Sequence, residues 1–141
     1  MADVEYVNLS INGQAVKGRK GQTIWQAAKD AGIFIPIYCY HPKMPPLGAC
    51  RICLVEVEKT PKPQAACTTA IAEGMVVRTE STYAEKARGG VMEFLLINHP
   101  LDCPICDKGG ECDLQNYAVE YGQSTGRFQE EKRHLGKALE L

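Results

Sequence analysis

The N-terminal residues alternate between apolar and polar side chains with the period of a β-strand. The alternation covers residues 4–11, and the Asn12-Gly13 dipeptide that follows is a strong signal for a two-residue hairpin. Residues 14–17 are expected to form the return strand, and residues 18–21 a basic loop. The pattern therefore predicts an opening β-hairpin.

After the hairpin the apolar spacing changes to that of a helix. Thr23 and Gln26 have the spacing of a capping box, in which each side chain bonds the backbone N–H of the other residue. Apolar residues recur at helical spacing from Ile24 to Ala31, and Gly32 stands where a C-terminal cap belongs. We expect one short amphipathic helix here.

The middle of the chain combines a long loop with short strands. Residues 38–53 are rich in proline, glycine and cysteine, and extended segments are expected at 54–58, 65–69 and 75–79. The element order is strand, strand, helix, loop and further strands. This order predicts a small mixed sheet with one helix across a face, which is an α+β fold.

A longer helix is expected at residues 82–97. Thr82 and Glu85 are spaced as a second capping box. The Gly89-Gly90 pair inside this helix costs roughly 1 kcal/mol per glycine relative to alanine. The pair therefore predicts either a bend or a close packing contact.

The remaining residues divide into a loop, a helix and a tail. A second cysteine-rich loop is expected at residues 98–110, and a short helix at residues 113–121. We expect one domain at residues 1–80, a second at residues 81–121, and a polar C-terminal extension over residues 122–141.

Charge and hydropathy exclude several classes of protein. The 141 residues carry 16 basic and 17 acidic side chains, a net charge of −1, so nucleic acid is not expected as a partner. The longest apolar runs are too short to span a bilayer, and we expect no direct membrane insertion. The acidic N-terminal residues lack the apolar core of a signal peptide. We expect the protein in the cytoplasm, or on the cytoplasmic face of a larger assembly.

The seven cysteines are the most unusual feature of the composition. A reducing compartment disfavours disulfides, and an odd number of cysteines cannot pair completely within one chain. Metal or redox chemistry is therefore the leading interpretation.

Four of the cysteines form a first ligand set with the spacing C-x10-C-x2-C-x13-C. The members of the set are Cys39, Cys50, Cys53 and Cys67. A Cys-x2-Cys pair in a tight loop directs two sulfurs at one centre, and two more sulfurs complete four thiolates. The small residues Gly48 and Ala49 let backbone N–H groups approach those sulfurs.

Two other interpretations of the first ligand set compete with an iron–sulfur centre. Structural zinc also takes four cysteines, but zinc ribbons usually carry two Cys-x2-Cys pairs, whereas Cys39 and Cys67 are solitary. Four buried apolar thiols are disfavoured because a polar loop carries three of them. The pattern favours iron–sulfur and is similar to a ferredoxin layout.

A second ligand set has the spacing H-x3-C-x2-C-x5-C. Its members are His99, Cys103, Cys106 and Cys112. Three thiolates leave a four-iron cluster one ligand short, and a neutral imidazole completes the shell without adding negative charge. Two alternatives stay open, which are a water ligand in place of His99 and zinc bound by three cysteines and one histidine.

The other notable side chains receive ordinary structural interpretations. His41 is expected to be a loop residue or a neighbour of the ligands, and His134 to lie on a solvated, mixed-charge face. Trp25 is expected to pack against a neighbouring loop or chain. Neither a phosphate-binding loop nor a dinucleotide fingerprint is present in the sequence.

The sequences of both ligand loops are similar to those of a known protein family. The segments CYHPKMPPLGACRICLVEVE and AACTTAIAEGM contain the first ligand set, and EFLLINHPLDCPICDKGGECDLQNYAVEYG contains the second. In this order they resemble the N-terminal iron–sulfur region of the G subunit of NADH:quinone oxidoreductase, respiratory complex I. The resemblance covers nearly the whole chain.

The resemblance implies a fold and two cofactors. The first domain would be a β-grasp ferredoxin with a [2Fe-2S] cluster on the first ligand set. The second would be a small helical domain with a [4Fe-4S] cluster on the second ligand set. Neither FMN nor NAD would bind to this chain, and we expect no NADH turnover from it alone.

The resemblance also implies partners in the peripheral arm of the complex, including the subunit that binds FMN and NADH, on the cytoplasmic face of the inner membrane. Electrons from NADH would arrive through FMN in a partner subunit and continue toward quinone. The same module occurs in iron-only hydrogenases and in subunits of NAD-linked hydrogenases and formate dehydrogenases, so these are alternatives, as is a zinc-clipped interaction module. The family continues into further cysteine-rich sites, so the end at Leu141 indicates either a fragment or a short homologue.

Overall fold

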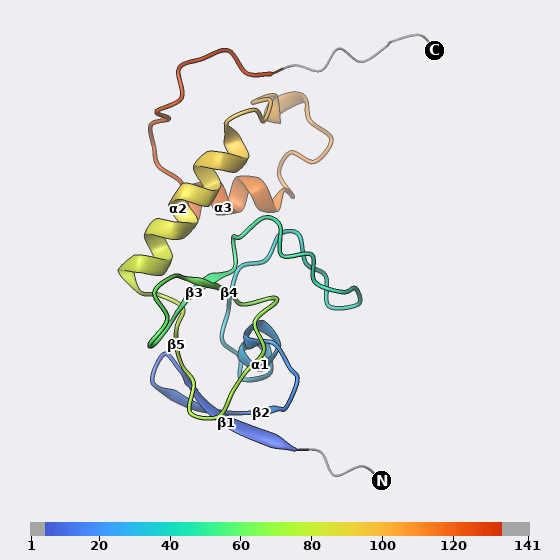
Figure 1. Cartoon of the computed structure of the whole chain (residues 1–141). Helices are drawn as coiled ribbons and strands as arrows, with labels where there is room; N and C mark the ends of the chain where they lie inside the picture. Colours follow the sequence, from blue (N-terminus) through green and yellow to red (C-terminus); the bar gives the residue numbers. More distant parts are fainter. Residues whose placement is uncertain (1–4, 134–141) are drawn as a thin grey trace.

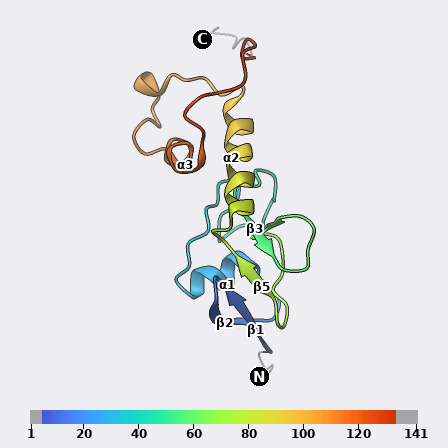
Figure 2. The same cartoon turned by 90° about the vertical axis from the view of Figure 1, so that its left-hand side faces the viewer.

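The structure, a computed structural model of the chain, describes residues 5–133. A sheet region with one helix lies at the N-terminal end, and a helical region lies at the other end (Figure 1). Helix α2 (Thr82–Leu96) leads from the sheet region into the helical region, and the view in Figure 2 shows the two regions one above the other. His134 lies outside the described residues, so its predicted position on a solvated face stays a prediction.

Five strands and four helical elements make up these regions. The strands are β1 (Tyr6–Ile11), β2 (Gln14–Arg19), β3 (Leu54–Val57), β4 (Gln64–Ala65) and β5 (Val76–Arg78). The helices are α1 (Ile24–Asp30), α2, the 3-10 helix η1 (Cys103–Ile105) and α3 (Asp113–Tyr121). The order of the elements follows the sequence prediction, and the predicted bounds of the last helix are the observed ones.

The strands form one mixed sheet in the order β2-β1-β5-β3-β4. The pair of β1 and β5 is parallel, and the other pairs are antiparallel. Asn12 and Gly13 turn the first hairpin with φ of 52° and 80°, because a type I′ turn requires the left-handed conformation at both residues. The return strand runs to Arg19, because Arg19 still pairs with Tyr6, so the loop predicted at 18–21 begins later.

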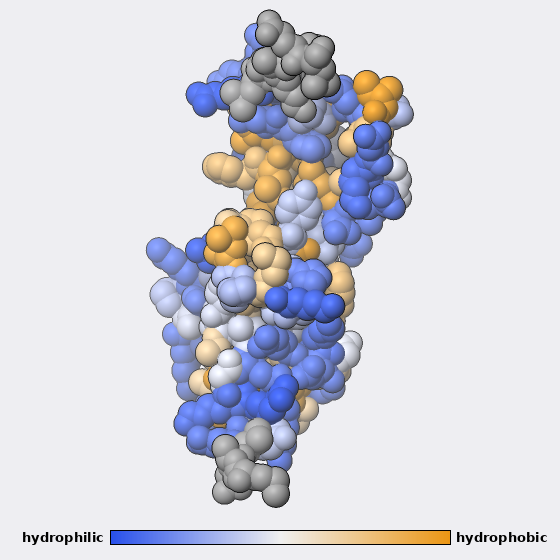
Figure 3. Space-filling model, turned by 90° about the vertical axis from the view of Figure 1, so that its right-hand side faces the viewer, coloured by the Kyte–Doolittle hydropathy of each residue, from blue (hydrophilic) through white to orange (hydrophobic). Residues whose placement is uncertain are grey.

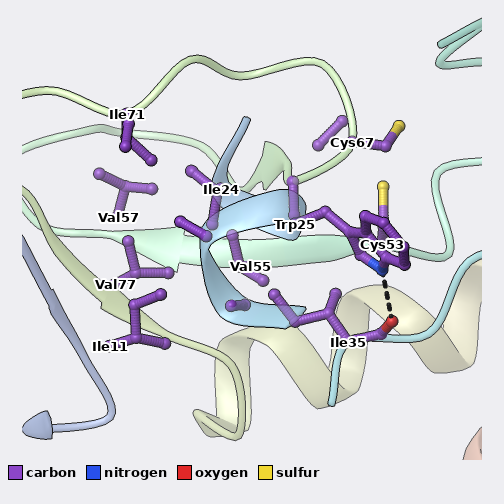
Figure 4. Packing of buried hydrophobic residues seen from close by; sticks show 14 of the residues in the cluster. Ile11, Ile24, Trp25, Ile35, Cys53, Val55, Val57, Cys67, Ile71 and Val77 are labelled. Atoms are coloured by element: carbon purple, nitrogen blue, oxygen red, sulfur yellow. Dashed lines mark hydrogen bonds between the residues drawn. The ribbon is translucent and has the colours of Figure 1, made fainter. Parts of the chain in front are cut away.

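Helix α1 covers the sheet and closes the main core (Figure 4). The predicted capping box is confirmed, with the Gln26 N–H donating to Thr23 Oγ1 at 3.2 Å and the Thr23 N–H donating to Gln26 Oε1 at 2.9 Å. The indole N–H of Trp25 donates to the Ile35 carbonyl oxygen at 3.0 Å, and its ring meets Tyr40 edge to face at 5.1 Å. Trp25 therefore packs against a neighbouring loop, as expected.

The start of helix α2 corrects the second predicted capping box. Ser81 is the N-cap, with extended backbone and a hydroxyl that accepts from the Ala84 N–H at 3.2 Å. Thr82 is already helical, so the predicted pairing of Thr82 with Glu85 is wrong by one residue. A Cβ on Gly89 would lie 3.3 Å from the Tyr121 carbonyl oxygen, which is a close packing contact of the predicted kind.

A second, smaller apolar cluster joins the two regions. Ile52 from the first cysteine loop is fully buried against Met92 of α2 and Leu114 of α3. The Tyr117 hydroxyl of α3 also donates to the Ile37 carbonyl oxygen at 3.1 Å. The helical region thus holds both ends of the first cysteine loop.

No helix within residues 5–133 is long and apolar enough to cross a membrane.

Candidate metal centres

The first ligand set lies where the long loop returns to the sheet. Cys53 directly precedes β3, and Cys67 lies in the turn that follows β4. A hydrogen bond from the Ala66 N–H to the Cys53 carbonyl oxygen (3.1 Å) ties the two segments together. Both side chains are buried in the main core, and Figure 4 shows their sulfurs at one end of it. Cys39 and Cys50 are half-buried.

Other members of the first ligand set affect the pKa of Cys67. The Cys50 N–H donates to Cys39 Sγ at 3.3 Å. Burial, reinforced by the charges of Cys53, Cys39 and Cys50, raises the pKa of Cys67 to about 12. A thiol with this pKa is protonated at neutral pH, so a metal that takes all four thiolates must displace protons. The structure thus places Cys39 beside Cys50, and Cys53 and Cys67 at one end of the main core (Figure 4).

Backbone N–H groups favour the thiolate form of Cys39. Burial acts to raise the pKa of Cys39, but the N–H groups of Cys50 and Ala49 outweigh it, and the pKa is lowered. Burial raises the pKa of Cys50. N–H groups that point at sulfur also stabilise the negative charge of a metal–thiolate centre.

The loop around the Cys-x2-Cys pair uses two left-handed residues. Gly48 has φ of +68°, and a Cβ there would lie only 2.9 Å from Thr68 Cγ2. Arg51 also has positive φ (64°), which is uncommon for a residue with a side chain and is typical of functional loops. The two residues bend the backbone around the sulfurs. Gly48 has a visible sequence signal, whereas Arg51 has none.

The second ligand set surrounds a cavity of about 230 Å³. All four of its members, His99, Cys103, Cys106 and Cys112, line this cavity. Apolar side chains from α2 and α3, including Leu96 and Leu114, form the rest of the wall. His99 and Cys106 are exposed, and Cys103 and Cys112 are half-buried. The four predicted ligands thus border one space.

Tight turns shape the loop at the edge of this cavity. Residues 103–105 form η1, and the Cys106 N–H donates to the Cys103 carbonyl oxygen at 3.3 Å. A Cβ on Gly109 would lie 2.5 Å from the same carbonyl oxygen, so only glycine fits there. The Gly110 N–H is bound by the Gln115 side chain at 2.9 Å. These contacts fold the chain back between Cys106 and Cys112.

The wall of the second cavity carries three thiols and one imidazole, which are donors that an iron–sulfur cluster takes. Among residues 5–133, no three His, Cys, Asp or Glu side chains converge closely enough to hold one metal ion. The cysteines of an iron–sulfur centre are ligands of different iron atoms within one cluster, so they surround a volume. The cavity bordered by the second ligand set is such a volume, and the residues present fit a cluster.

Three residues near the sites were missed by sequence reasoning. Arg88 of α2 is buried and donates to the Leu54 carbonyl oxygen at 3.2 Å. Ile52 and Tyr117 connect the first loop to the helical region. An apolar residue inside a polar cysteine loop was an available signal for Ile52, whereas Arg88 and Tyr117 carry no local signal. His41 is a loop residue, and its Nδ1 accepts from the Lys43 N–H at 3.2 Å.

The chain matches two family models, which together cover most of it. Residues 5–82 match the 2Fe-2S iron-sulfur cluster binding domain. The chain belongs to this family. Residues 88–127 match the NADH-ubiquinone oxidoreductase-G iron-sulfur binding region. Together they confirm the expected fold class, a ferredoxin-like domain followed by a helical iron–sulfur region.

Relatives of the chain are named as subunits of NADH-quinone or NADH-ubiquinone oxidoreductase. The G subunit of NADH-quinone oxidoreductase from Rickettsia bellii is 54% identical over 129 residues, which is 92% of this chain and 19% of that protein. The mitochondrial NADH-ubiquinone oxidoreductase 78 kDa subunit of Neurospora crassa is 57% identical over 124 residues, 88% of this chain and 17% of that protein. The resemblance to the iron–sulfur region of the G subunit is confirmed. The chain spans about a fifth of the length of these relatives.

A solved structure shares the fold. It is the crystal structure of an NAD⁺-reducing [NiFe]-hydrogenase in the H₂-reduced state, with a TM-score of 0.77 and 30% identity. The match covers 90% of this chain and 55% of that chain.

Proposed function

We propose that this chain is an electron-transfer module with one [2Fe-2S] cluster on the first ligand set and one [4Fe-4S] cluster on the second. When bound, the clusters supply one-electron chemistry at fixed positions. The observation that carries the proposal is the cavity whose wall contains His99, Cys103, Cys106 and Cys112. Four metal-binding side chains that border one space support a metal centre at this position.

The chain's own residues give the two centres different surroundings. At the first centre, the core excludes water from Cys53 and Cys67, and the Cys50 N–H stabilises the charge on Cys39. At the second centre, Leu96 and Leu114 form an apolar wall on one side. His99 contributes a neutral ligand there, and a less negative ligand shell accepts an electron more easily.

The names of the relatives support a place in NADH:quinone oxidoreductase. Electrons from NADH would reach this chain through FMN in a partner subunit and leave toward quinone, on the cytoplasmic face of the membrane. Figure 3 shows apolar surface gathered over the helical part of one face. Exposed apolar side chains such as Leu101, Ile105 and Val119 support contact with other protein surfaces. FMN and NAD would be bound by partners.

A second candidate is an electron relay in a hydrogenase. The shared fold and 30% identity with a chain of an NAD⁺-reducing [NiFe]-hydrogenase favour this alternative. The residues of the chain would do the same work in either complex, because only the source and destination of the electrons differ. Co-purification of the native complex distinguishes the two, since hydrogenase subunits would accompany the chain in one case and quinone-reducing subunits in the other.

A redox titration of the reconstituted protein tests the electron-transfer role. The expected result is two EPR signals of different temperature dependence, each appearing and disappearing reversibly in a one-electron step. A protein that binds iron but shows no reversible reduction would contradict the role. A colourless protein with tightly bound zinc would support the zinc-clipped interaction module instead.

A further inference from the structure

Arg88 is a buried cation next to the first ligand set. It lies on α2 and is 3% exposed, and within residues 5–133 it is the only charged residue that is buried. Its Nη2 donates to the Leu54 carbonyl oxygen at 3.2 Å, and Leu54 directly follows the ligand Cys53. The guanidinium thus reaches from the helical region into the wall of the first site.

The surroundings of Arg88 compensate its charge only in part. The guanidinium lies over the Tyr121 ring at 5.4 Å, and within the described part of the chain its buried Nε has no hydrogen-bond partner. Burial lowers the pKa of Arg88. Tyr121 and Cys53 act in the opposite direction, and so do the exposed carboxylates of Glu80 and Glu85. Guanidinium keeps its proton even when buried, so this position holds a positive charge. A buried charge is costly unless an opposite charge stands nearby.

A cluster on the first ligand set would add opposite charge on the side of Cys53. Four thiolates and two sulfides around two ferric ions carry net negative charge, and one-electron reduction makes the group more negative. A fixed cation therefore stabilises the reduced form more than the oxidised form. The low-dielectric core around Cys53 strengthens this effect, whereas water screens the exposed arginines.

We propose that Arg88 is a positioning residue that raises the reduction potential of the first centre by its buried charge. The proposal rests on the proposed function, because it requires a cluster on the first ligand set. It also gives the helical region a part in the chemistry of the sheet region, since the charge comes from α2. The structural alternative is that Arg88 only joins α2 to β3 through its bond to Leu54.

The test is an EPR-monitored redox titration of the reconstituted full chain with Arg88→Met and Arg88→Lys. We expect Arg88→Met to lower the potential of the first centre, with the reduction equilibrium weakened about tenfold, which is about 59 mV for a one-electron couple. Arg88→Lys keeps the charge and is expected to stay closer to the wild-type potential. Thermal unfolding of the cluster-free proteins, measured in parallel, reports the structural contribution separately.

Arg78→Met is the matched control. Arg78 lies on β5 of the sheet region, but it is half exposed and pairs with Glu58 at 2.6 Å. Its removal also takes away one positive charge, and we expect the potential of the first centre to change little. An equal shift in Arg78→Met and Arg88→Met would overturn the proposal, because it would show that burial gives Arg88 no special effect.

The remaining outcomes are also decisive. If Arg88→Met kept its full iron content and the wild-type reduction potential of the first centre, the proposal would be overturned. The proposed electron-transfer function would stay intact. Loss of the cluster in both Arg88→Met and Arg88→Lys would show a purely structural role, and loss in Arg88→Met alone would support the need for charge. A wild-type protein without any iron–sulfur signal would overturn the proposed function itself.

Discussion

The two ligand sets lie in regions of very different construction. The first is backed by a sheet core of seventeen buried residues that includes Cys53 and Cys67 themselves. The second is carried by a loop beside a cluster of three buried residues, one of which, Ile52, comes from the first cysteine loop. The comparison indicates that the fold preorganises the first site, whereas the second site depends on its neighbours for support.

The difference also extends to solvent contact. In the first set two sulfurs are buried, but in the second His99 and Cys106 are exposed. Exposure is one of the properties that set the potential of an iron–sulfur centre. The two sites therefore offer a cluster different environments within one short chain, and substitutions in each region are expected to affect them unequally.

The largest expected effect comes from removing one ligand of each set. Cys39→Ser is expected to abolish the EPR signal of the first centre and leave that of the second, because Cys39 is half-buried in a loop and contributes little to the core. Cys106→Ser is the corresponding test at the second centre, and we expect it to abolish only the EPR signal of that centre. Loss of both signals in either variant would mean that the two loops fold as one unit.

Shortening Ile52 should damage both regions at once. Its fully buried side chain packs against Met92 and Leu114, so Ile52→Ala is expected to cost about 2–5 kcal/mol in the free energy of unfolding. Denaturant unfolding measures this loss, and iron content at each centre reports its consequence.

Ile11→Ala is the matched control for the Ile52 substitution, since Ile11 is equally buried but belongs only to the sheet core. We expect a similar loss of stability without selective loss of the second cluster. If Ile52→Ala spared the second cluster completely, the shared apolar cluster would not support that site.

A methyl group at position 48 should strain the first loop specifically. Gly48→Ala places a residue in the left-handed region, at a cost of about 1–2 kcal/mol, and its Cβ would press on Thr68. Gly74→Ala is the control, because Gly74 has a similar φ (70°) and open space around its Cβ position. The thermal unfolding temperature and the iron content should both be lower for Gly48→Ala than for Gly74→Ala. Equal losses in the two variants would show that the Thr68 contact has no effect of its own.

The smallest expected effect is a change of potential without loss of structure. His99→Cys replaces a neutral ligand with a thiolate, so the potential of the second centre should fall, on the order of 100 mV by analogy with Rieske centres. A redox titration measures it, with His99→Gln as the variant that adds no charge. An unchanged or raised potential in His99→Cys would contradict direct ligation by His99.

Local chemistry explains what the sequence predicted well. Asn12-Gly13 and Thr23 act on residues within three positions, so their turn and cap are visible in the sequence alone. Both ligand sets stay predictions as ligands, although cysteine and histidine at these spacings have few other roles. The second cap was misplaced because Ser81 and Thr82 are adjacent and chemically similar, and only the backbone conformation distinguishes them.

Tertiary contacts explain what the sequence could not predict. Arg88 donates a hydrogen bond to Leu54, which is 34 positions away in the sequence, and Tyr117 donates one to Ile37, which is 80 positions away. No local pattern encodes such distances, because each partner is a backbone carbonyl that every residue possesses. The predicted domain boundaries at 80/81 and 121/122 stay predictions. At the boundary at 80/81, α2 and the packing of Ile52 connect the regions on either side.

Metal and sulfide analysis of the anaerobically purified chain, with EPR of the reduced sample, tests most directly whether two unlike regions hold two unlike clusters. We predict about six iron atoms and about six sulfides per chain, with two distinct EPR signals. About two zinc ions per chain, no sulfide and no EPR signal would contradict the two-cluster interpretation and indicate a zinc-clipped module.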